Sequence, residues 1–474
     1  MLTLADILEA LSGVRPDRAN QVITDAVTDS RQAIPGCLFI ALPGERADGH
    51  DFIQEAFENG ARFALVQKDL TDQFALLNLL GEWQPDELSK IGDAPLCLLV
   101  NDSLQGLQKI ARFWRRKLDL RVVGITGSVG KSTTKELVAE VLGQRYRTLK
   151  NPGNLNNEIG LPLTLLRLSE LHERAVLEMG FYVPGEIAFL CDLALPQIGV
   201  VTNVGTVHAE RAGSQEAIAR GKSELVQALP AEPEGVAILN YDDRWVRQMA
   251  AKTQARVFFY GLDSNADLWA DGVESLGLEG IRFRLHYHGE ILHLRVPLLG
   301  RHSVHTALRA AAVGLVDNLT WQEIVRGLRS GNAQLRLVAV RVPNGALILD
   351  DTYNASPQST LAALNLLEEL GGRKVAVLGD MLELGQYEAL GHEMVGVRVA
   401  EIADALVTVG ARGHMIAAAA IRSGLSEELV TELDSVEDAI RHLRERLGSG
   451  DVVLIKGSHG MRMDRIASAL EESS

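Results

Sequence analysis

Short apolar runs, each followed by a segment in which apolar residues have helical spacing, recur along most of the chain. The runs span four to six residues, which is typical of strands buried in a parallel sheet. They lie at residues 37–42, 63–66, 96–100, 122–125, 175–179, 198–202, 236–240, 346–350, 374–379, 405–409 and 452–455. Residues 281–296 instead alternate apolar and polar side chains around His288 and Gly289, which predicts an antiparallel hairpin. Strands alternating with helices predict an α/β protein with mostly parallel, doubly wound sheets.

The length of the chain and the order of these segments predict three domains. A chain of 474 residues accommodates roughly three domains at the usual ~150 residues each. We predict an N-terminal domain at residues 1–105, a central domain at residues 106–334 and a C-terminal domain at residues 335–474. Residues 81–95 are polar and contain proline and glycine, so we interpret them as a surface excursion and not as a domain boundary.

Composition narrows the class of protein. Hydrophobic residues make up 46% of the chain and charged residues 23%, so it can bury several cores and is not disordered. The net charge of −15 argues against nucleic-acid binding by the protein as a whole. Its three cysteines lie far apart, which favours reduced core thiols over a disulfide or zinc framework. The N-terminus has no basic-then-apolar leader and no apolar stretch approaches ~18 residues, so we expect a cytoplasmic protein without a membrane partner.

A glycine-containing segment follows the apolar run at residues 122–125 and precedes a helical pattern. It consists of Thr126, Gly127, Ser128, Val129, Gly130, Lys131, Ser132 and Thr133. The glycines let backbone amides converge on an anion, the helix N-terminus adds its dipole, and the lysine supplies a positive charge. The serine hydroxyl suits the Mg²⁺ ion that accompanies a nucleoside triphosphate. Ile125 stands where the common phosphate-loop pattern has glycine, which favours ATP-driven amide ligases over NTPases in general.

Other segments carry candidate site residues, each with an ordinary structural alternative. Glu178 ends a buried strand, where parallel sheets bind ligands, and is either a Mg²⁺ ligand or a salt-bridged core acid. His208 also follows a strand end and is either a second metal ligand or a satisfied polar residue. Lys222, taken alone, is an ordinary helix-surface lysine. The asparagine-rich residues 151–163 and the polar residues 28–52 are each as suited to turns as to ligand contacts.

Taken together, several strings of the chain resemble the Mur ligases, which are ATP-dependent carboxylate–amine ligases. They are the glycine-containing segment, residues 297–302, 350–357, 379–385 and 456–458, and His392. The strings Asp-Asp-Thr-Tyr-Asn-Ala-Ser-Pro and Gly-Asp-Met-Leu-Glu-Leu-Gly single out the member that adds D-alanyl-D-alanine. The Asp-Asn-Pro-Arg string expected of the diaminopimelate-adding sister enzyme is absent. The resemblance implies a three-domain architecture with a central P-loop ATPase-like domain and a Rossmann-like C-terminal domain.

The resemblance also implies a reaction. ATP phosphorylates the terminal carboxylate of UDP-N-acetylmuramoyl-tripeptide, and the amine of D-Ala-D-Ala attacks the resulting acyl phosphate. Lys131 would neutralise phosphate charge, Ser132 and Glu178 would hold one Mg²⁺, and His208 and a carbamylated Lys222 would hold a second. We expect a monomer whose partners are these small molecules. The third residue of the tripeptide stays open.

Binding residues follow from the same resemblance. Nucleotide contacts would come from the segment Thr126 to Thr133 and from Asn203, Thr306, Arg336 and Asp351. Substrate contacts would come from Ser30, Arg31, Gly44, His50, Asn154, Asn157, Tyr353, Asn354, Ser356 and Lys456. One departure concerns adenine recognition. The family has two asparagines where this chain has Ser303 and Thr306, and the second asparagine commonly contacts adenine.

Two other interpretations stay open at this point. The first is another carboxylate–amine ligase of the superfamily, such as a folylpolyglutamate synthetase or a different Mur enzyme, although the two C-terminal strings disfavour it. The second is a nucleotide-switched binding protein that hydrolyses ATP slowly, which leaves Glu178, His208 and Lys222 without a role.

Overall fold

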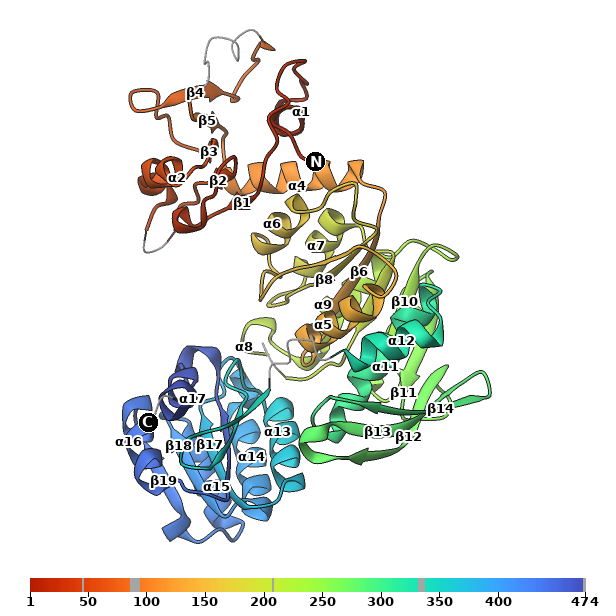
Figure 1. Ribbon diagram of the computed structural model, residues 1–474, viewed down its shortest axis with the longest axis vertical. Coiled ribbons are helices and arrows are strands. Elements are labelled where there is room, and N and C mark those ends of the chain that lie inside the picture. Colours follow the sequence, from red (N-terminus) through yellow and green to blue (C-terminus); the bar gives the residue numbers. More distant parts are fainter. Residues whose placement is uncertain (45–46, 86–93, 207–208, 331–336, 472–474) are drawn as a thin grey trace. The chain divides into compact units, whose positions relative to one another are not determined.

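The computed structural model describes residues 1–44, 47–85, 94–206, 209–330 and 337–471 (Figure 1). They separate into two compact units. Unit 1 contains Met1–Gly124, Tyr146–Gly180 and Glu186–Ile198, and unit 2 contains Ile125–Arg145, Phe181–Gly185 and Gly199–Ser474. This division does not test the domain bounds expected at residues 105 and 334, which stay a prediction. Within the described ranges, no helix is both long and apolar enough to cross a membrane.

Unit 1 holds a parallel sheet built on the first predicted strands. Its order within the described residues is β1-β2-β3-β5-β4, and every pairing is parallel. The strands are β1 (Ala26–Val27), β2 (Leu38–Ile40), β3 (Phe63–Val66), β4 (Ala75–Asn78) and β5 (Leu96–Leu99). β2, β3 and β5 confirm the predicted apolar runs. β1 and β4 lack a predicted counterpart because β1 has two residues and β4 is only partly buried, so neither forms a long apolar run.

Two helices of unit 1 begin after residues whose side chains cap them. α1 (Leu4–Ser12) follows Thr3, whose hydroxyl accepts a hydrogen bond from the Asp6 amide, and it stops at Gly13, where φ is 79°. α4 (Ser103–Lys117) follows Asp102, whose carboxylate accepts from the Gln105 amide. The other α-helices are α2 (Ile53–Glu58), α6 (Gly160–Leu166) and α7 (Glu186–Ala194).

A second sheet runs in the order β14-β13-β12-β11-β10-β9-β6-β8-β7. Its strands are β6 (Arg121–Thr126), β7 (Thr148–Lys150), β8 (Arg174–Glu178), β9 (Ile198–Val201), β10 (Val236–Asn240), β11 (Arg256–Gly261), β12 (Leu268–Ser275), β13 (Ile281–Tyr287) and β14 (Glu290–Val296). β10, β11 and β12 pair in parallel, whereas β12, β13 and β14 pair antiparallel. The predicted hairpin is confirmed: β13 and β14 turn at His288 and Gly289, whose φ angles of 48° and 82° suit a tight two-residue turn.

Three helices of unit 2, α5 (Lys131–Leu142), α11 (Val304–Val316) and α12 (Trp321–Arg329), pack against one another. Gly327 permits α12 to approach α5 closely, because a Cβ at this position would lie 2.5 Å from the Cα of Val141 in α5. α11 is buried along almost its whole length, which suits its run of small alanines. The shorter α8 (Ala209–Ala212) and α10 (Arg244–Arg247), and α9 (Gln215–Gln227), belong to the same unit.

The last sheet follows the predicted strand–helix alternation and has the order β15-β16-β20-β17-β18-β19. Its strands are β15 (Val338–Arg341), β16 (Leu347–Asp350), β17 (Arg373–Gly379), β18 (Ala405–Val409), β19 (Val430–Leu433) and β20 (Asp451–Lys456). Among the described strands of this last sheet, only the β15–β16 pairing is antiparallel. The helices are α13 (Pro357–Glu369), α14 (Glu388–Ile402), α15 (Gly413–Arg422), α16 (Val436–Arg446) and α17 (Asp464–Glu471).

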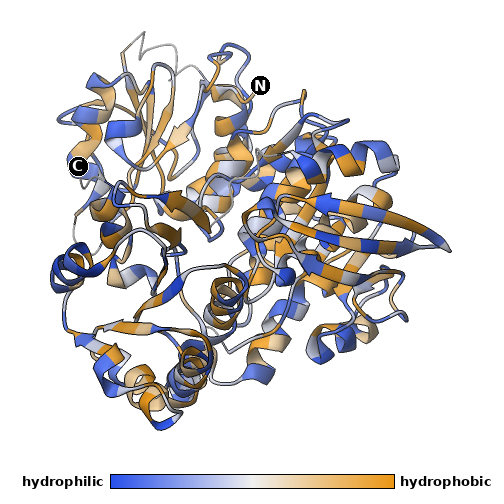
Figure 2. Ribbon diagram, turned by 60° about the horizontal axis from the view of Figure 1, so that its bottom comes forward, coloured by the Kyte–Doolittle hydropathy of each residue, from blue (hydrophilic) through white to orange (hydrophobic). Residues whose placement is uncertain are grey.

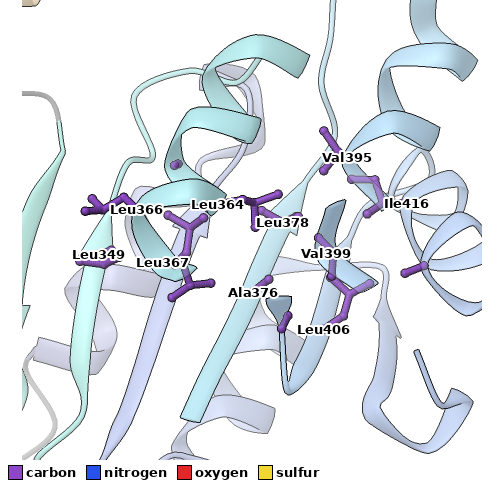
Figure 3. Close-up of a cluster of buried hydrophobic side chains, with 14 of the residues drawn as sticks. Leu349, Leu364, Leu366, Leu367, Ala376, Leu378, Val395, Val399, Leu406 and Ile416 are labelled. Carbon is purple, nitrogen blue, oxygen red and sulfur yellow. The ribbon is translucent and has the colours of Figure 1, made fainter. Parts of the chain in front are cut away.

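Both faces of this last sheet are covered by apolar side chains. Along β17, Ala376 and Leu378 enter a cluster with residues of α13, α14 and α15, as Figure 3 shows. Val375 and Val377, which alternate with these two residues along the strand, enter a second cluster with residues of α16 and α17. Because side chains alternate across a strand, a continuous apolar run serves both faces at once. Figure 2 shows hydrophobic residues along the sheet strands and mixed hydropathy along the helices.

We expect Leu378→Ala to weaken this sheet. Leu378 is 1% exposed, and truncating such a core leucine costs about 2–5 kcal/mol. Hydrogen exchange of the β17 and β18 amides should report a lower opening free energy by about that amount. Leu390→Ala is the control, because Leu390 is 56% exposed and its truncation should change the value by no more than about 0.5 kcal/mol. Equal effects of the two substitutions would contradict the assigned core.

Candidate active site

The segment at residues 126–133 has the backbone of a phosphate loop. β6 ends at Thr126 and α5 begins at Lys131, so the loop lies between a strand and a helix N-terminus, as predicted. Gly127 has φ 147°, and a Cβ there would fall 1.8 Å from the hydroxyl oxygen of Thr202. Gly130 has φ 83° and directly precedes α5. Both positions therefore require glycine. The Lys131 ammonium donates to the Gly127 carbonyl at 2.9 Å and so lies over the loop.

Residues that follow β9 hold this loop in place. The Asn203 side chain accepts from the Val129 amide at 2.9 Å and donates to the Val129 carbonyl at 3.2 Å. The Thr202 hydroxyl donates to the same carbonyl at 2.7 Å. The Ser128 amide donates to the Asn203 carbonyl at 3.0 Å, and the Ser128 hydroxyl accepts from the Gly205 amide. Asn203, which we expected to contact nucleotide, thus uses both ends of its amide to shape the phosphate loop.

Lys222 lies inside unit 2 and not on a helix surface. It is 1% exposed on α9, with its ammonium nitrogen 4.7 Å from the ring centroid of Phe181. Gly221 leaves room for that ring, since a Cβ there would lie 2.0 Å from a Phe181 ring carbon. Burial, reinforced by the positive charge of Lys131, holds the pKa of the Lys222 amine well below its usual range. The site therefore favours the neutral amine.

A cavity of about 380 Å³ in unit 2 brings many of the predicted residues together. From the phosphate loop it is lined by Ser128, Val129, Gly130 and Thr133. From other predicted positions it is lined by Asn203, Thr306, Asp351, Tyr353, Asn354, Ser356 and Lys456. These residues are far apart in sequence, and several of them lie at or just after the carboxyl ends of β6, β9, β16 and β20. Ligand sites at the carboxyl ends of such strands are the usual arrangement in α/β proteins.

A buried ion pair shapes the wall of this cavity formed by residues 351–356. The Lys456 ammonium donates to the Asp351 carboxylate at 2.6 Å and to the Asn354 carbonyl at 2.8 Å, and Lys456 is 2% exposed. Ser356 caps α13, accepting from the Ser359 amide, and Pro357 occupies the first turn. Lys456 and Ser356 therefore act on the backbone here. The side chains of Tyr353 and Asn354 also line the cavity.

Several residues of the cavity, among them His302 and Arg309, were not among the predicted site residues. Burial, with the positive charges of His305 and Arg309 as further causes, lowers the pKa of His302 to about 4, so the ring is neutral near pH 7. Arg309 is 4% exposed and donates to the Thr306 hydroxyl at 2.8 Å. A sequence signal was present for Arg309, because it is the sole charged residue in the apolar segment 306–316. Such a residue needs a partner inside the fold.

In unit 1, Glu178 ends β8 and is 1% exposed. Asn156 donates to its carboxylate at 2.9 Å, and Asn151 bonds its backbone amide and carbonyl. The Asn157 side chain instead accepts a hydrogen bond from the Gly160 amide at the start of α6, and Asn154 is exposed. Asn156 is thus a functional candidate that the sequence analysis missed, although it belongs to the same asparagine-rich string.

The remaining predicted residues of unit 1 lie near β1, β2 and β3. Ser30 and Arg31 belong to the short 3₁₀ helix Ser30–Gln32. The Ser30 hydroxyl donates to the Glu55 carboxylate at 2.7 Å, and the Arg31 guanidinium donates two hydrogen bonds to the Asp29 carboxylate. His50, in the 3₁₀ helix Gly49–Phe52, contacts the Asp48 carboxylate through Nδ1 at 2.6 Å and accepts from the Gln67 amide through Nε2. The Gly44 amide donates a hydrogen bond to the Ala47 carbonyl.

Two predicted residues, His208 and Arg336, lie outside the described residues. Within the described ranges, no group of three or more His, Cys, Asp or Glu side chains is arranged to hold a metal ion. The three cysteines are buried and unpaired with one another, as expected from the sequence.

Comparison with known proteins assigns the family. The Mur ligase middle domain matches residues 125–314, the Mur ligase glutamate ligase domain matches residues 335–459, and the Mur ligase family catalytic domain matches residues 23–76. The chain belongs to the Mur ligase family. Its α/β fold with three Mur ligase domains and mostly parallel sheets agrees with the fold class expected from the sequence.

Individual Mur ligases match over the full length of the chain. The UDP-N-acetylmuramoyl-tripeptide–D-alanyl-D-alanine ligase of Bacillus subtilis is 36% identical over 99% of this chain and 98% of its own. The structure of MurF from Acinetobacter baumannii is similar with a TM-score of 0.82 and 30% identity, covering 99% of this chain and 98% of its own. MurF ligase from Thermotoga maritima in complex with ADP has a TM-score of 0.76 and 28% identity, covering 94% and 97%.

We expect Asp351→Asn to destabilise the cavity wall. The substitution leaves the Lys456 ammonium buried opposite a neutral amide, which costs about 3–5 kcal/mol. The double variant Asp351→Asn, Lys456→Met no longer contains the unpaired buried ammonium and should recover much of the lost stability. Thermal unfolding without nucleotide compares the two variants with the parent protein. A single Asp351→Asn variant as stable as the parent would show that the ion pair does not hold this wall.

Proposed function

We propose that this Mur ligase joins D-alanyl-D-alanine to UDP-N-acetylmuramoyl-tripeptide, forming UDP-N-acetylmuramoyl-pentapeptide and converting ATP to ADP and phosphate. The observation that carries the proposal is the cavity in which the phosphate loop and the string at residues 351–356 meet. That string is one of the two that single out this reaction within the family. Full-length relatives named for the same reaction support the assignment. A cytoplasmic location and a monomeric state stay predictions from the sequence.

The chemistry requires a carboxylate to become an electrophile. The terminal carboxylate oxygen of the tripeptide attacks the γ-phosphorus of ATP, and ADP leaves. The amine of D-Ala-D-Ala then attacks the acyl carbon, phosphate leaves with the bond electrons, and the amine loses a proton. Two anions must approach in the first step, so positive charge and amide donors are needed around the γ-phosphate. Lys131 and the loop amides at the start of α5 supply them.

The donor chemistry of the predicted metal residues fits Mg²⁺. Ser132 offers a hydroxyl in the first turn of α5, and Glu178 offers a buried carboxylate whose orientation is set by Asn156. Both are oxygen ligands of the kind that Mg²⁺ prefers. When bound, the ion neutralises charge on the phosphate oxygens. His208 and Lys222 are proposed for the second ion, and Lys222 needs modification before it can serve.

Carbamylation of Lys222 follows from its surroundings. An ammonium repels a metal ion, whereas a carbamate presents two anionic oxygens. The reaction joins the neutral amine nitrogen to the carbon of CO₂ and releases a proton. It therefore requires the depressed pKa that burial and Lys131 impose on this amine. Among the residues that the structure describes, no carboxylate forms an ion pair with Lys222 that would keep it protonated.

The substrates divide between two groups of residues in this proposal. Tyr353 and Asn354 contact nucleotide or dipeptide from the cavity wall, with Ser356 and Lys456 holding that wall in shape. Ser30, Arg31, Gly44, His50, Asn154 and Asn157 receive the UDP-linked substrate. Of these, Arg31 is exposed on its 3₁₀ helix and would exchange Asp29 for an anionic ligand. Both ring nitrogens of His50 already form hydrogen bonds, so His50 would support substrate binding by holding the turn at Asp48 in place.

The test of the function measures phosphate release with ATP, Mg²⁺ and UDP-N-acetylmuramoyl-tripeptide, with and without D-Ala-D-Ala. The dipeptide should stimulate release strongly, and the pentapeptide product should appear in equal amount. Lys131→Ala removes the cation beside the γ-phosphate and should lower turnover by a factor of about 100 or more. Stimulation by another amine and not by D-Ala-D-Ala, or ATP turnover independent of any amine, would replace the proposed reaction.

A second experiment addresses the carbamate. Lys222→Ala should be nearly inactive, and formate or acetate should restore part of the activity by occupying the vacated oxygen-ligand position. Lys131→Ala treated in the same way is the control, because its lost cation cannot be replaced by a carboxylate. Full activity of Lys222→Ala without additive would show that the lysine only fills space beside Phe181.

A further inference from the structure

Arg309 is a buried cation that lines the proposed nucleotide cavity. It is 4% exposed at the middle of α11. One terminal nitrogen donates to the Thr306 hydroxyl at 2.8 Å, and the other lies 3.5 Å from the Tyr260 hydroxyl, a long and weak contact. Its Nε is buried without a hydrogen-bond partner. In the portion of the chain that the structure describes, no carboxylate forms an ion pair with Arg309.

The neighbouring groups do not compensate this charge. Burial raises the pKa of Tyr260 to about 12, so the phenol is neutral, and it donates weakly to the carbonyls of Val201 and Thr202. The two acids whose charges act on Tyr260 are already engaged. Asp242 contacts His305 at 2.8 Å, and Asp243 accepts from the Val204 amide and caps α10. A buried guanidinium without a counter-charge costs several kcal/mol, so such a group indicates an anion that arrives from outside the chain.

The guanidinium faces the phosphate loop. A Cβ built on Gly130 would lie 3.2 Å from the nearest terminal nitrogen of Arg309 and 3.9 Å from its central carbon. Gly130 directly precedes the N-terminus of α5. Loop amides at such a helix N-terminus bind the phosphates of a nucleotide. The unsatisfied cation and the anion-binding backbone therefore lie on the same side of one cavity.

We propose that Arg309 binds the phosphate chain of the nucleotide and is held in place by Thr306. This proposal deepens the proposed function and rests on its nucleotide site. Thr306 stands where the family has an adenine-contacting asparagine, and here its oxygen accepts a hydrogen bond from Arg309. Part of the recognition in this chain is thereby moved from the base to the phosphates. Arginine suits this role because its fork of donors matches phosphate oxygens.

Nucleotide fragments separate the two kinds of contact. Dissociation constants for ADP and adenosine are measured by calorimetry, without Mg²⁺ or acceptor substrates, for the parent protein and for Arg309→Met. The loss of charge-assisted hydrogen bonds should weaken ADP about 10- to 100-fold. Adenosine, which has no phosphate, should bind as before. Arg309→Lys keeps a positive charge and should recover part of the ADP affinity. The control Arg422→Met removes an exposed arginine of α15 and should leave both constants unchanged.

Thermal unfolding without nucleotide distinguishes phosphate binding from a packing role. If Arg309 only packed the fold, Arg309→Met would lower the unfolding temperature. Met fills a similar volume without a buried charge, so Arg309→Met should unfold at the same or a higher temperature than the parent. ADP should then stabilise the variant much less than it stabilises the parent. This pattern is the one that phosphate binding requires.

Other results would overturn the proposal. An unchanged ADP constant would show that Arg309 does not contact phosphate. Equal losses for ADP and adenosine, or a lower unfolding temperature of the nucleotide-free Arg309→Met variant, would assign Arg309 to base recognition or to packing. These outcomes are independent of the reaction, because the binding assay uses neither the tripeptide nor D-Ala-D-Ala. A parent protein that binds ADP but forms no pentapeptide would refute the proposed reaction and leave the role of Arg309 intact.

Discussion

The attachment of Val129 to the residues after β9 is the interaction on which the candidate site depends. Asn203 bonds both the amide and the carbonyl of this residue, and Thr202 bonds the carbonyl a second time. The loop is thereby drawn so close to Thr202 that Gly127 has no room for a side chain. With its backbone held from this side, the loop presents its remaining amides and the start of α5 to the cavity. Such a preformed site needs little reorganisation when it binds phosphate.

Buried positive charge distinguishes the parts of the site from one another. Lys456 has its counter-charge inside the chain, in Asp351, and so it stabilises the wall that it belongs to. Lys222 is buried beside an aromatic ring, and burial together with the charge of Lys131 lowers the pKa of its amine. Arg309 cannot lose its proton in this way, because a guanidinium stays charged in proteins. The cost of burying a positive charge is therefore met in three ways: by the ion pair of Lys456, by the lowered pKa of Lys222 and, in our proposal, by a phosphate bound at Arg309.

Much of the fold was predictable because long apolar runs report on burial directly. The runs that became β2, β3, β5, β6, β8, β9, β10, β16, β17, β18 and β20 are continuous because both faces of their sheets are covered. β13 and β14 were predictable from alternation and from the turn residues His288 and Gly289. β1 has only two residues, and β4 and β7 have four and three residues that are mostly only partly buried. Such short or exposed segments do not form a recognisable apolar run in the sequence. Pairing, and not sequence pattern, defines them.

The sequence by itself determined the phosphate loop, the family and a part of the polar lining of the cavity, because glycine spacing and short polar strings have few structural solutions. Only the tertiary structure decided what each polar side chain does there. Asn203 shapes a loop, Asn156 in place of Asn154 or Asn157 contacts Glu178, and Lys456 pairs with Asp351. Arg309 acquired its significance from a glycine 179 positions earlier in the chain and from having no ion-paired carboxylate within the described residues. Hydrogen bonds and charge compensation depend on distances between segments remote in sequence, and no local pattern encodes those distances.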